Sequence, residues 1–351
     1  MRLTSAIAAA AAVLLIGACG NSGGSAETAA PAATGGATDS FPVSIEHKYG
    51  TTEVKAEPKR ILVAGLTEQD SLLALGIVPV ATTEWFGEYP GAIWPWAQDE
   101  LGAAEKPVVL TNTDGYQFEK IAAQRPDLII GLYSGITQAD YDTLSKIAPT
   151  IAQPKGGIDW GISWQDNIRT VGKAVGRTAA AEKVVTDVEG KVAAAKAANP
   201  QFAGQTAVVA AQYEGYYVYG SQDPRGRLLT DLGFSLPPGL DELTGKEFGV
   251  SLSKERTDLL DVGAIVWLVD KYDTEKTKIQ ADPLYAKLKV KTEGRDIFLE
   301  TGEELSGATS FISALSLPYL IDNLVPQLAA AADGDPATPV VRVTNPAPSA
   351  S

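Results

Sequence analysis

Short apolar runs alternate along this chain with longer alanine-rich helical patterns, and this alternation limits the possible folds. The run Arg60–Ala64 predicts a buried strand, Glu68–Leu75 predicts a helix, and Val78–Ala81 predicts the next strand. The helix predicted for Phe118–Gln124 is again followed by a strand, Asp127–Leu132. Such alternation is typical of βαβ units around a mostly parallel sheet, so the sequence predicts an α/β protein.

A longer helical pattern separates two such regions. Apolar residues recur at helical spacing from about Trp164 to Ala198, with a break in register near Gly176–Arg177. The alternation then restarts with the strand Thr206–Ala211 and the helix Gly226–Leu232. We therefore predict an N-terminal lobe over residues 41–160, an interlobe helical segment over 161–199 and a C-terminal lobe over 200–332.

The N-terminus has the features of an export signal. Arg2 precedes an apolar stretch from Ala6 to Ile16, which is too short to span a bilayer stably. The only cysteine of the chain, Cys19, follows Gly17–Ala18 in a pattern that resembles the bacterial lipobox. We expect residues 1–18 to be a signal peptide, Cys19 to carry acyl chains such as palmitate, and residues 19–40 to form a flexible tether.

These features predict a lipoprotein at the extracytoplasmic face of the cell membrane. The alternative is an ordinary signal peptide followed by an incidental cysteine. With Cys19 acylated, no disulfide can form, so both lobes must be stable through their cores. The tail of residues 333–351 is rich in Pro and Ala and is predicted to be disordered.

Charge and histidine content exclude several classes of function. The formal net charge of −14 argues against binding to nucleic acid or adsorption on anionic lipid. The only histidine, His47, lies in a predicted edge strand, Val43–Tyr49, where we expect a solvated side chain. A Ser-His-Asp triad or a His-rich zinc site cannot be built without it, and no nucleotide-binding or hydrolase motif occurs. We expect a protein that is not an enzyme.

An internal similarity relates the two predicted lobes. The segment Glu119–Ile130 aligns without gaps on Glu255–Val266, and each copy predicts a short helix followed by a buried strand. Both glutamates lie in the first helical turn, where the helix dipole favours a carboxylate, and Ser253 is a candidate cap for the second copy. Without further information these are glutamates at equivalent helix starts.

Several segments between about residues 41 and 330 stand in a distinctive order and spacing, namely Glu57–Val63, Leu75–Val80, Phe118–Ile121, Arg125–Ile130, Leu228–Phe234 and Leu252–Glu255. Together they resemble the iron-siderophore substrate-binding proteins of ABC importers. The resemblance implies a class III periplasmic-binding-protein fold, in which two Rossmann-like lobes are joined by a single long interlobe helix and the ligand binds between them. It further implies that Glu119 and Glu255 dock on arginines of the permease dimer. We expect the receptor to be a monomer.

Aromatic residues are the main candidates for ligand contacts. The loop Glu84–Trp96 contains five aromatic residues, of which we expect Trp85, Tyr89 and Trp94 to contact the ligand. Further rings follow predicted strands or precede the interlobe segment, namely Tyr133, Trp160, Trp164 and Tyr213. Of these, we expect Tyr133, Trp164 and Tyr213 to contact the ligand. Large rings on loops suit a bulky, partly apolar ligand. The alternative for each ring is packing in the core.

Few basic residues are available near these loops. Arg225, Arg227 and Lys155 are the main candidates, and Arg225 is predicted to contact the ligand, with a helix-start ion pair as the alternative. A ferric tricatecholate is strongly anionic and would need a cluster of bases, so a neutral or cationic ferric hydroxamate fits better. Its iron arrives chelated, so we expect neither a protein metal ligand nor a cofactor.

Two other functions remain open from the sequence. A receptor of the same fold could bind heme or a corrinoid, with an axial ligand from His47 or a tyrosine. A tethered surface enzyme or an adhesion module is the alternative from another class.

Overall fold

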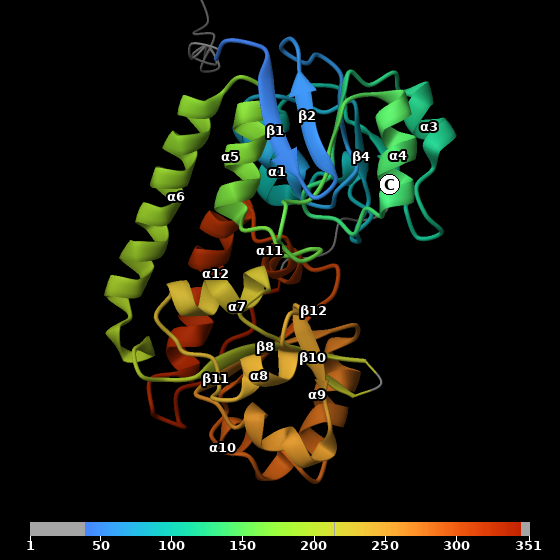
Figure 1. Cartoon of the computed structure of the whole chain (residues 1–351). Coiled ribbons are helices and arrows are strands. Elements are labelled where there is room, and N and C mark those ends of the chain that lie inside the picture. The colour runs from blue at the N-terminus through green and yellow to red at the C-terminus, as the bar shows by residue number, and fades with distance from the viewer. Residues whose placement is uncertain (1–38, 214, 345–351) are drawn as a thin grey trace, which may run out of the picture. The chain divides into compact units, whose positions relative to one another are not determined.

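The computed structural model describes residues 39–213 and 215–344 of the chain. Within these residues the strands form two five-stranded sheets and one two-stranded hairpin (Figure 1). Helices accompany both sheets, so the predicted α/β class is confirmed. The predicted signal peptide, Cys19 and almost all of the predicted tether lie outside the described residues.

The N-terminal sheet is parallel throughout and has the strand order β5-β4-β3-β6-β7. All residues of β3, β4 and β6 are buried, as expected for a parallel sheet covered on both faces. The strand order reverses direction between β3 and β6, and open α/β sheets bind ligands at the carboxyl ends of such strands. The strands are β3 (Ile61–Val63), β4 (Ala81–Thr83), β5 (Val108–Leu110), β6 (Leu128–Ile130) and β7 (Thr150–Ile151).

Helices and an antiparallel hairpin complete the N-terminal lobe. The hairpin pairs β1 (Val43–His47) with β2 (Gly50–Val54). The helices are α1 (Glu68–Ala74), α2 (Gln98–Leu101), α3 (Phe118–Ala123) and α4 (Gln138–Ile147), with 3-10 turns η1 (Pro90–Ala92) and η2 (Pro95–Ala97). A capping box between Thr137 and Asp140 begins α4 and satisfies backbone N–H groups of its first turn.

The C-terminal sheet repeats this strand order as β10-β9-β8-β11-β12, with β9 antiparallel to both of its neighbours. Its strands are β8 (Ala207–Gln212), β9 (Tyr216–Tyr219), β10 (Gly249–Leu252), β11 (Ala264–Val269) and β12 (Asp296–Glu300). In both sheets the first strand is central and the fourth strand pairs with it in parallel.

The helices of the C-terminal lobe surround this sheet. They are α7 (Pro224–Asp231), α8 (Leu240–Thr244), α9 (Tyr272–Ala281), α10 (Lys289–Thr292), α11 (Glu304–Phe311) and α12 (Ser316–Ala331), with 3-10 turns η3 (Pro200–Phe202), η4 (Lys254–Leu260) and η5 (Tyr285–Lys287). No single helix among the described residues is long and apolar enough to cross a bilayer; α11 and α12 pass that test only together, as a pair bent by 117°.

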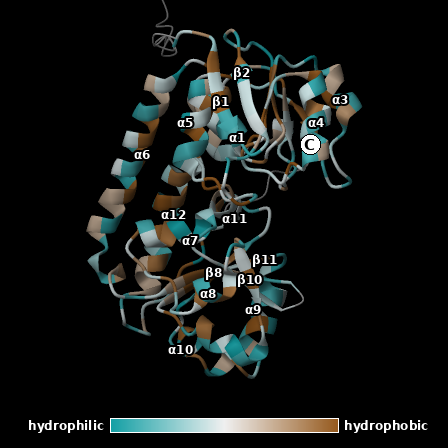
Figure 2. Ribbon diagram, in the orientation of Figure 1, coloured by the Kyte–Doolittle hydropathy of each residue, from teal (hydrophilic) through white to brown (hydrophobic). Residues whose placement is uncertain are grey.

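The predicted interlobe segment consists of α5 (Trp164–Ala174) and α6 (Thr178–Ala198). The break lies where the register predicted it, at Gly176, whose φ of 70° suits glycine. The 21-residue α6 is the long helix, and Figure 2 shows polar and apolar residues alternating along it. Ile168 of α5 packs in the core of the C-terminal lobe and Val171 in that of the N-terminal lobe, so one helix is shared by both cores.

The structure corrects the expectation that His47 is solvated. His47 is 1% exposed, because the alternation of β1 places it on the inward face together with Ile45. Its Nε2 lies 2.9 Å from Thr52 Oγ1, whose hydroxyl donates to the carbonyl of Thr150 at 2.6 Å. The Tyr49 N–H donates to His47 Nδ1 at 3.3 Å. Since Nδ1 accepts and Nε2 donates in this chain of hydrogen bonds, the imidazole is neutral.

Residues 333–344 correct part of the predicted disorder of the tail. The guanidinium of Arg342 lies 2.7 Å from Glu303 and 3.5 Å from Glu300, and it stacks 3.6 Å above the ring of Tyr272. Val340 also packs against the core of the C-terminal lobe. An arginine that finds two carboxylates and a ring can hold a segment whose composition otherwise predicts disorder.

We expect the free energy of unfolding of the wild-type protein to fall more steeply below pH 6.5 than that of a His47→Gln variant. Burial lowers the pKa of His47 from its ordinary 6.5. The unfolded chain therefore binds the proton first, and the stability present above pH 6.5 is lost as the pH falls through the folded-state pKa. Urea titrations at a series of pH values measure this difference. Parallel pH profiles for the two proteins would contradict it.

Candidate functional site

Glu68 is fully buried between the loops that follow β3 and β6. Its carboxylate accepts hydrogen bonds from the N–H of Thr67 at 3.0 Å and from the N–H of Tyr133 at 2.6 Å. A Cβ at Gly65 would lie 2.2 Å from Glu68 Oε1, so only glycine lets the loop pass this close. Burial raises the pKa of Glu68, and the hydrogen bonds from backbone N–H groups act against that rise. The carboxylate thereby joins the two loops at the carboxyl end of the sheet.

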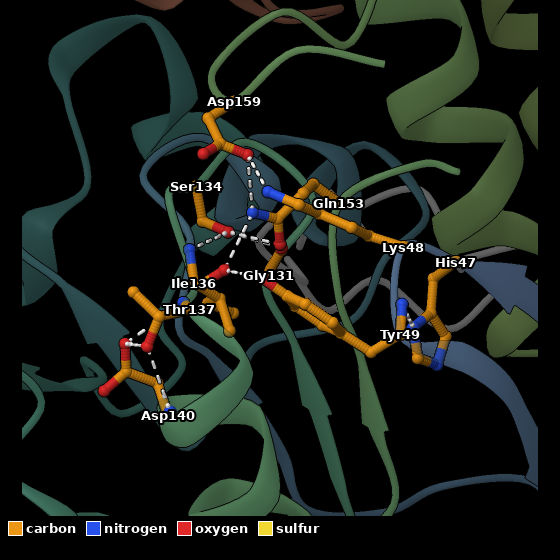
Figure 3. Close-up of polar contacts among 10 residues, drawn as sticks. All are labelled: His47, Lys48, Tyr49, Gly131, Ser134, Ile136, Thr137, Asp140, Gln153 and Asp159. Atoms are coloured by element: carbon orange, nitrogen blue, oxygen red, sulfur yellow. Dashed lines mark hydrogen bonds and ion pairs between the residues drawn. The ribbon is translucent and has the colours of Figure 1, made fainter. Parts of the chain in front are cut away.

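A second polar network, drawn in Figure 3, ties the segment after β7 to the loop after β6. Gln153 Nε2 donates to the carbonyl of Ile136 at 3.0 Å and to Asp159 Oδ1 at 2.9 Å. Lys48 Nζ forms an ion pair with the same Asp159 oxygen at 2.7 Å. The N–H of Trp160 donates to the carbonyl of Ser134 at 3.2 Å. Asp159 is therefore held through its side chain, and Trp160 through its backbone N–H.

Two cavities share Trp160 as a lining residue. The first has a volume of about 220 Å³, lies at the carboxyl end of the N-terminal sheet, and is lined by Ala64, Leu66, Asn112, Gly115, Tyr116, Ser134, Gly135, Asp140 and Trp160. The second has a volume of about 310 Å³ and is lined from both lobes, by Lys48, Gly157, Ile158, Asp159, Trp160, Lys246, Glu247 and Phe248. Ring centroids of Trp160 and Phe248 are 6.3 Å apart, so the two lobes touch here. These cavities form the candidate cleft.

A group of aromatic side chains from the C-terminal lobe adjoins Phe248. Tyr217 lies 5.9 Å from Phe248, 5.8 Å from Tyr213 and 5.2 Å from Tyr219, measured between ring centroids. Tyr213 follows β8 and is 65% exposed, whereas Tyr219 is buried. These rings present a wide apolar surface with hydroxyl groups at its edge, which suits a bulky ligand with polar atoms.

Arg225 lies at the start of α7 and is buried. Its Nε and Nη2 donate to both carboxylate oxygens of Asp223, at 2.7 and 2.8 Å, and its guanidinium stacks 3.8 Å from the centre of the Tyr219 ring. The helix-start ion pair, which was the alternative from the sequence, is therefore present. A ligand oxygen could accept a hydrogen bond only from Nη1 of Arg225. The positive charge of the Arg225 guanidinium is already balanced by the Asp223 carboxylate.

The aromatic loop after β4 packs mainly against the C-terminal lobe. Tyr89 is 5% exposed and Trp94 is 1% exposed, and both belong to a cluster with Phe311 at the end of α11. A Cβ at Gly307 would lie 2.3 Å from the Trp94 ring, which shows how closely α11 approaches. Trp85 is half-buried and lies 5.7 Å from the ring of Tyr133. In this structure Tyr89 and Trp94 join the lobes, so Trp85 is the more accessible predicted contact.

Tyr133 and Trp164 lie at the junction of the lobes. Both are buried and both line a cavity of about 10 Å³. Trp164 also lines a cavity of about 310 Å³ between α5, α6 and α7, which shares no lining residue with the two cavities at Trp160. The predicted ligand contacts are thus distributed over the cleft and the junction, and Tyr213 is the one that is mostly exposed.

Several side chains at the candidate cleft, Trp160 among them, were not among the predicted contacts. Tyr116 and Phe248 gave no signal in the sequence, because each is a single ring in a loop. Tyr217 and Tyr219 occupy alternate positions in β9, so a strand prediction for this segment would have placed both on one face. No cluster of three or more His, Cys, Asp or Glu side chains suited to a metal ion occurs in the part of the chain that the structure describes.

Glu119 and Glu255 occupy equivalent places in the two lobes. Each lies in the first turn of a short helix, α3 or η4, that leads into the fourth strand of its sheet. Both side chains are exposed. Ser253 stands at the N-cap position of η4 but makes no capping hydrogen bond; hydrogen bonds from the backbone N–H of Glu255 and from Ser253 lower the pKa of Glu255. The predicted internal similarity is thus confirmed at the level of secondary structure.

Asp70 connects the lobes through a buried carboxylate. Its Oδ2 accepts hydrogen bonds from Trp96 Nε1 at 2.8 Å and from Ser313 Oγ, beyond α11, at 2.5 Å. Its Oδ1 has no hydrogen-bond partner among the described residues. Burial raises the pKa of Asp70 to about 6, against the opposing effect of the two hydrogen bonds.

We expect the free energy of unfolding of the wild-type protein to decrease between about pH 4 and pH 6.5 relative to that of Asp70→Asn. Between the unfolded pKa of 3.8 and the folded pKa of about 6, the folded protein binds the proton more tightly, so this contribution favours the folded state at low pH and is lost as the pH rises. Thermal or urea unfolding at both pH values measures the difference. Identical pH dependence of the two proteins would show that Asp70 does not titrate on unfolding.

Comparison with known proteins identifies the family. The probable siderophore-binding lipoprotein YfiY of Bacillus subtilis is 30% identical over 245 residues, which cover 66% of this chain and 70% of that protein. A periplasmic solute binding protein from Mycobacterium smegmatis is 34% identical, with a TM-score of 0.71 over 82% of this chain and 98% of that chain. PiaA of Streptococcus pneumoniae, solved with ferrichrome, is 27% identical, with a TM-score of 0.72 over 83% of this chain and 98% of that chain. A model of the periplasmic binding proteins matches residues 62–299, and the chain belongs to this family.

Proposed function

We propose that this chain is an extracytoplasmic receptor that binds a ferric siderophore, of the hydroxamate type, and delivers it to an ABC permease. Membership of the periplasmic binding proteins supports the receptor role. The names of YfiY and of the PiaA–ferrichrome complex support a siderophore as the ligand. The aromatic side chains of both lobes at the cleft supply the apolar contact area that such a bulky chelate needs.

The choice of a hydroxamate chelate rests on the charge of the cleft. Lys48 lines the larger cavity at Trp160 and is paired with Asp159, and Lys246 lines it beside Glu247. Arg225, which lines neither cavity, is paired with Asp223. A strongly anionic tricatecholate would require basic groups that are not already neutralised by carboxylates. A neutral or cationic hydroxamate complex requires only rings and a few hydrogen-bonding groups.

A histidine of this chain is not available as the axial ligand of a heme or corrinoid. His47 is the only histidine of the chain, is buried, and uses both ring nitrogens in hydrogen bonds within the hairpin region. A heme receptor would therefore need a tyrosine as its axial ligand. An enzyme or adhesion role has no support beyond the composition.

We also propose that Cys19 carries the lipid that anchors the receptor to the membrane. The pattern before Cys19 and the lipoprotein name of YfiY support this anchor.

Intrinsic tryptophan fluorescence should be quenched when a ferric hydroxamate such as ferrioxamine B or ferrichrome is added. Tyr213→Ala should weaken binding by about 1–3 kcal/mol, because a ring in contact with the ligand is lost. Tyr213→Phe should lose less, since the ring remains. Val108→Ala, at the opposite end of the N-terminal sheet, is the control, because it also removes an exposed apolar side chain. Tight binding of a tricatecholate without any response to hydroxamates would refute the choice of chelate.

Glu119 and Glu255 are proposed to dock the receptor on arginines of the permease dimer. Their equivalent positions in the two lobes support simultaneous contact with two permease subunits. We expect Glu119→Arg or Glu255→Arg to reduce uptake of the iron chelate at least about tenfold, because facing like charges cost several kcal/mol, while chelate affinity stays unchanged. Glu53→Arg, at an exposed position of β2, is the matched charge reversal. Normal uptake by both variants, or loss of chelate binding, would reject the docking role.

A further inference from the structure

Trp160 has an unusual backbone conformation for a bulky residue. Its φ is 55°, in the left-handed region that favours glycine, and its side chain is 38% exposed. Residues held in this region persist where the surroundings fix them, and they are frequent at ligand-binding sites. Here the hydrogen bond from the Trp160 N–H and the tethered neighbour Asp159 hold the segment.

The indole of Trp160 packs so closely on Gly135 that a side chain at this position would clash with it. A Cβ at Gly135 would lie 2.5 Å from both Cη2 and Cζ2 of the ring, and the three nearest atoms are all atoms of Trp160. The same indole lines both cavities of the cleft. Trp160 is therefore common to the cavity of about 310 Å³, which both lobes line, and to the neighbouring cavity of about 220 Å³, which we call the inner chamber.

The inner chamber has a distinct chemistry. Among its lining residues Asp140 is the one charged side chain, and no lysine, arginine or histidine lines it. The two hydrogen bonds to the Asp140 carboxylate both come from Thr137 and both use Oδ2, at 3.1 and 2.6 Å. Asn112, Ser134 and the ring of Tyr116 add polar groups and an aromatic face. A carboxylate beside aromatic rings favours a cation, through charge and through cation–π attraction.

We propose that the inner chamber is a second compartment of the ligand site, closed by the Trp160 indole, which takes a neutral or cationic limb of the chelate, and a primary ammonium in particular. The inference rests on the proposed function, because the chelated iron and its main body would occupy the outer cavity and the aromatic surface of the C-terminal lobe. Asp140 receives the ammonium, and the indole moves off Gly135 to admit it.

The proposed cation preference of the inner chamber can be tested with two ferric chelates that differ only in the charge of one terminal group. Ferrioxamine B carries a primary ammonium, and its N-acetyl derivative is neutral at the same atom. Calorimetric titration of the full protein should give about three- to tenfold tighter binding of the ammonium form, the scale of one partly buried ion pair. Asp140→Asn should bring this ratio close to one. Asp142→Asn, an exposed position of α4 that does not line the chamber, should leave the ratio unchanged.

Gly135→Ala tests whether the Trp160 indole acts as a lid that closes the inner chamber. The added methyl group would displace the indole and would meet no other residue closely. In stopped-flow measurements the association rate of ferrioxamine B should rise at least about twofold if movement of the indole limits entry. Trp160→Gly removes the indole, suits the positive φ and should raise the rate in the same way, so the test holds even if Gly135→Ala does not fold.

The outcomes separate this inference from the proposed function. If both chelates bind equally well and Asp140→Asn changes nothing, the chamber takes no cation and the inference is wrong while the proposed function stands. If association rates are unchanged in both lid variants, Trp160 does not close the chamber. If neither chelate binds to the wild-type protein, the proposed function fails and the inference fails with it.

Discussion

The buried carboxylate of Glu68 is the interaction on which the geometry of the cleft depends. It accepts hydrogen bonds from loops that follow β3 and β6, the two strands at which the sheet changes direction. Without it, buried N–H groups of Thr67 and Tyr133 would lack partners, at a cost of about 1–3 kcal/mol each. Because Gly65 leaves room for the carboxylate, a negative charge serves here as a structural acceptor. These loops supply Ala64, Leu66, Ser134 and Gly135 to the lining of the cavity at the carboxyl end of the N-terminal sheet.

The two lobes are connected by a shared helix and by buried contacts between them, in addition to the chain that links them. Ile168 and Val171 of α5 belong to different cores, so this helix cannot tilt without disturbing the packing of one lobe. Asp70 and the cluster around Phe311 add contacts between the loop after β4 and the helices of the C-terminal lobe. A receptor built in this way has little freedom to close its lobes as rigid bodies. A response to a ligand would then be local, as in the movement proposed for Trp160.

Aromatic side chains serve two different purposes in this protein. Trp94 and Phe311 are buried between the lobes and contribute stability through their apolar area. Tyr213, Tyr217 and Trp160 remain partly or mostly exposed at the cleft, where burial by a ligand would release the same kind of free energy. The ion pairs of the cleft keep its net charge low. Together these features favour a ligand that is large, partly apolar and not strongly anionic.

The amino-acid sequence by itself determined the α/β class, the break between α5 and α6, and the equivalence of Glu119 and Glu255, because local periodicity and short-range similarity encode these features. It could not decide which rings face a ligand, since a tryptophan in a loop looks the same whether it packs on Gly307, as Trp94 does, or lies beside a cavity, as Trp160 does. It also missed the burial of His47, whose ring lies 5.1 Å from that of Tyr141 in α4 and whose partner Thr52 donates to the carbonyl of Thr150 in β7. These properties depend on contacts between residues far apart in the chain, and only tertiary packing creates those contacts.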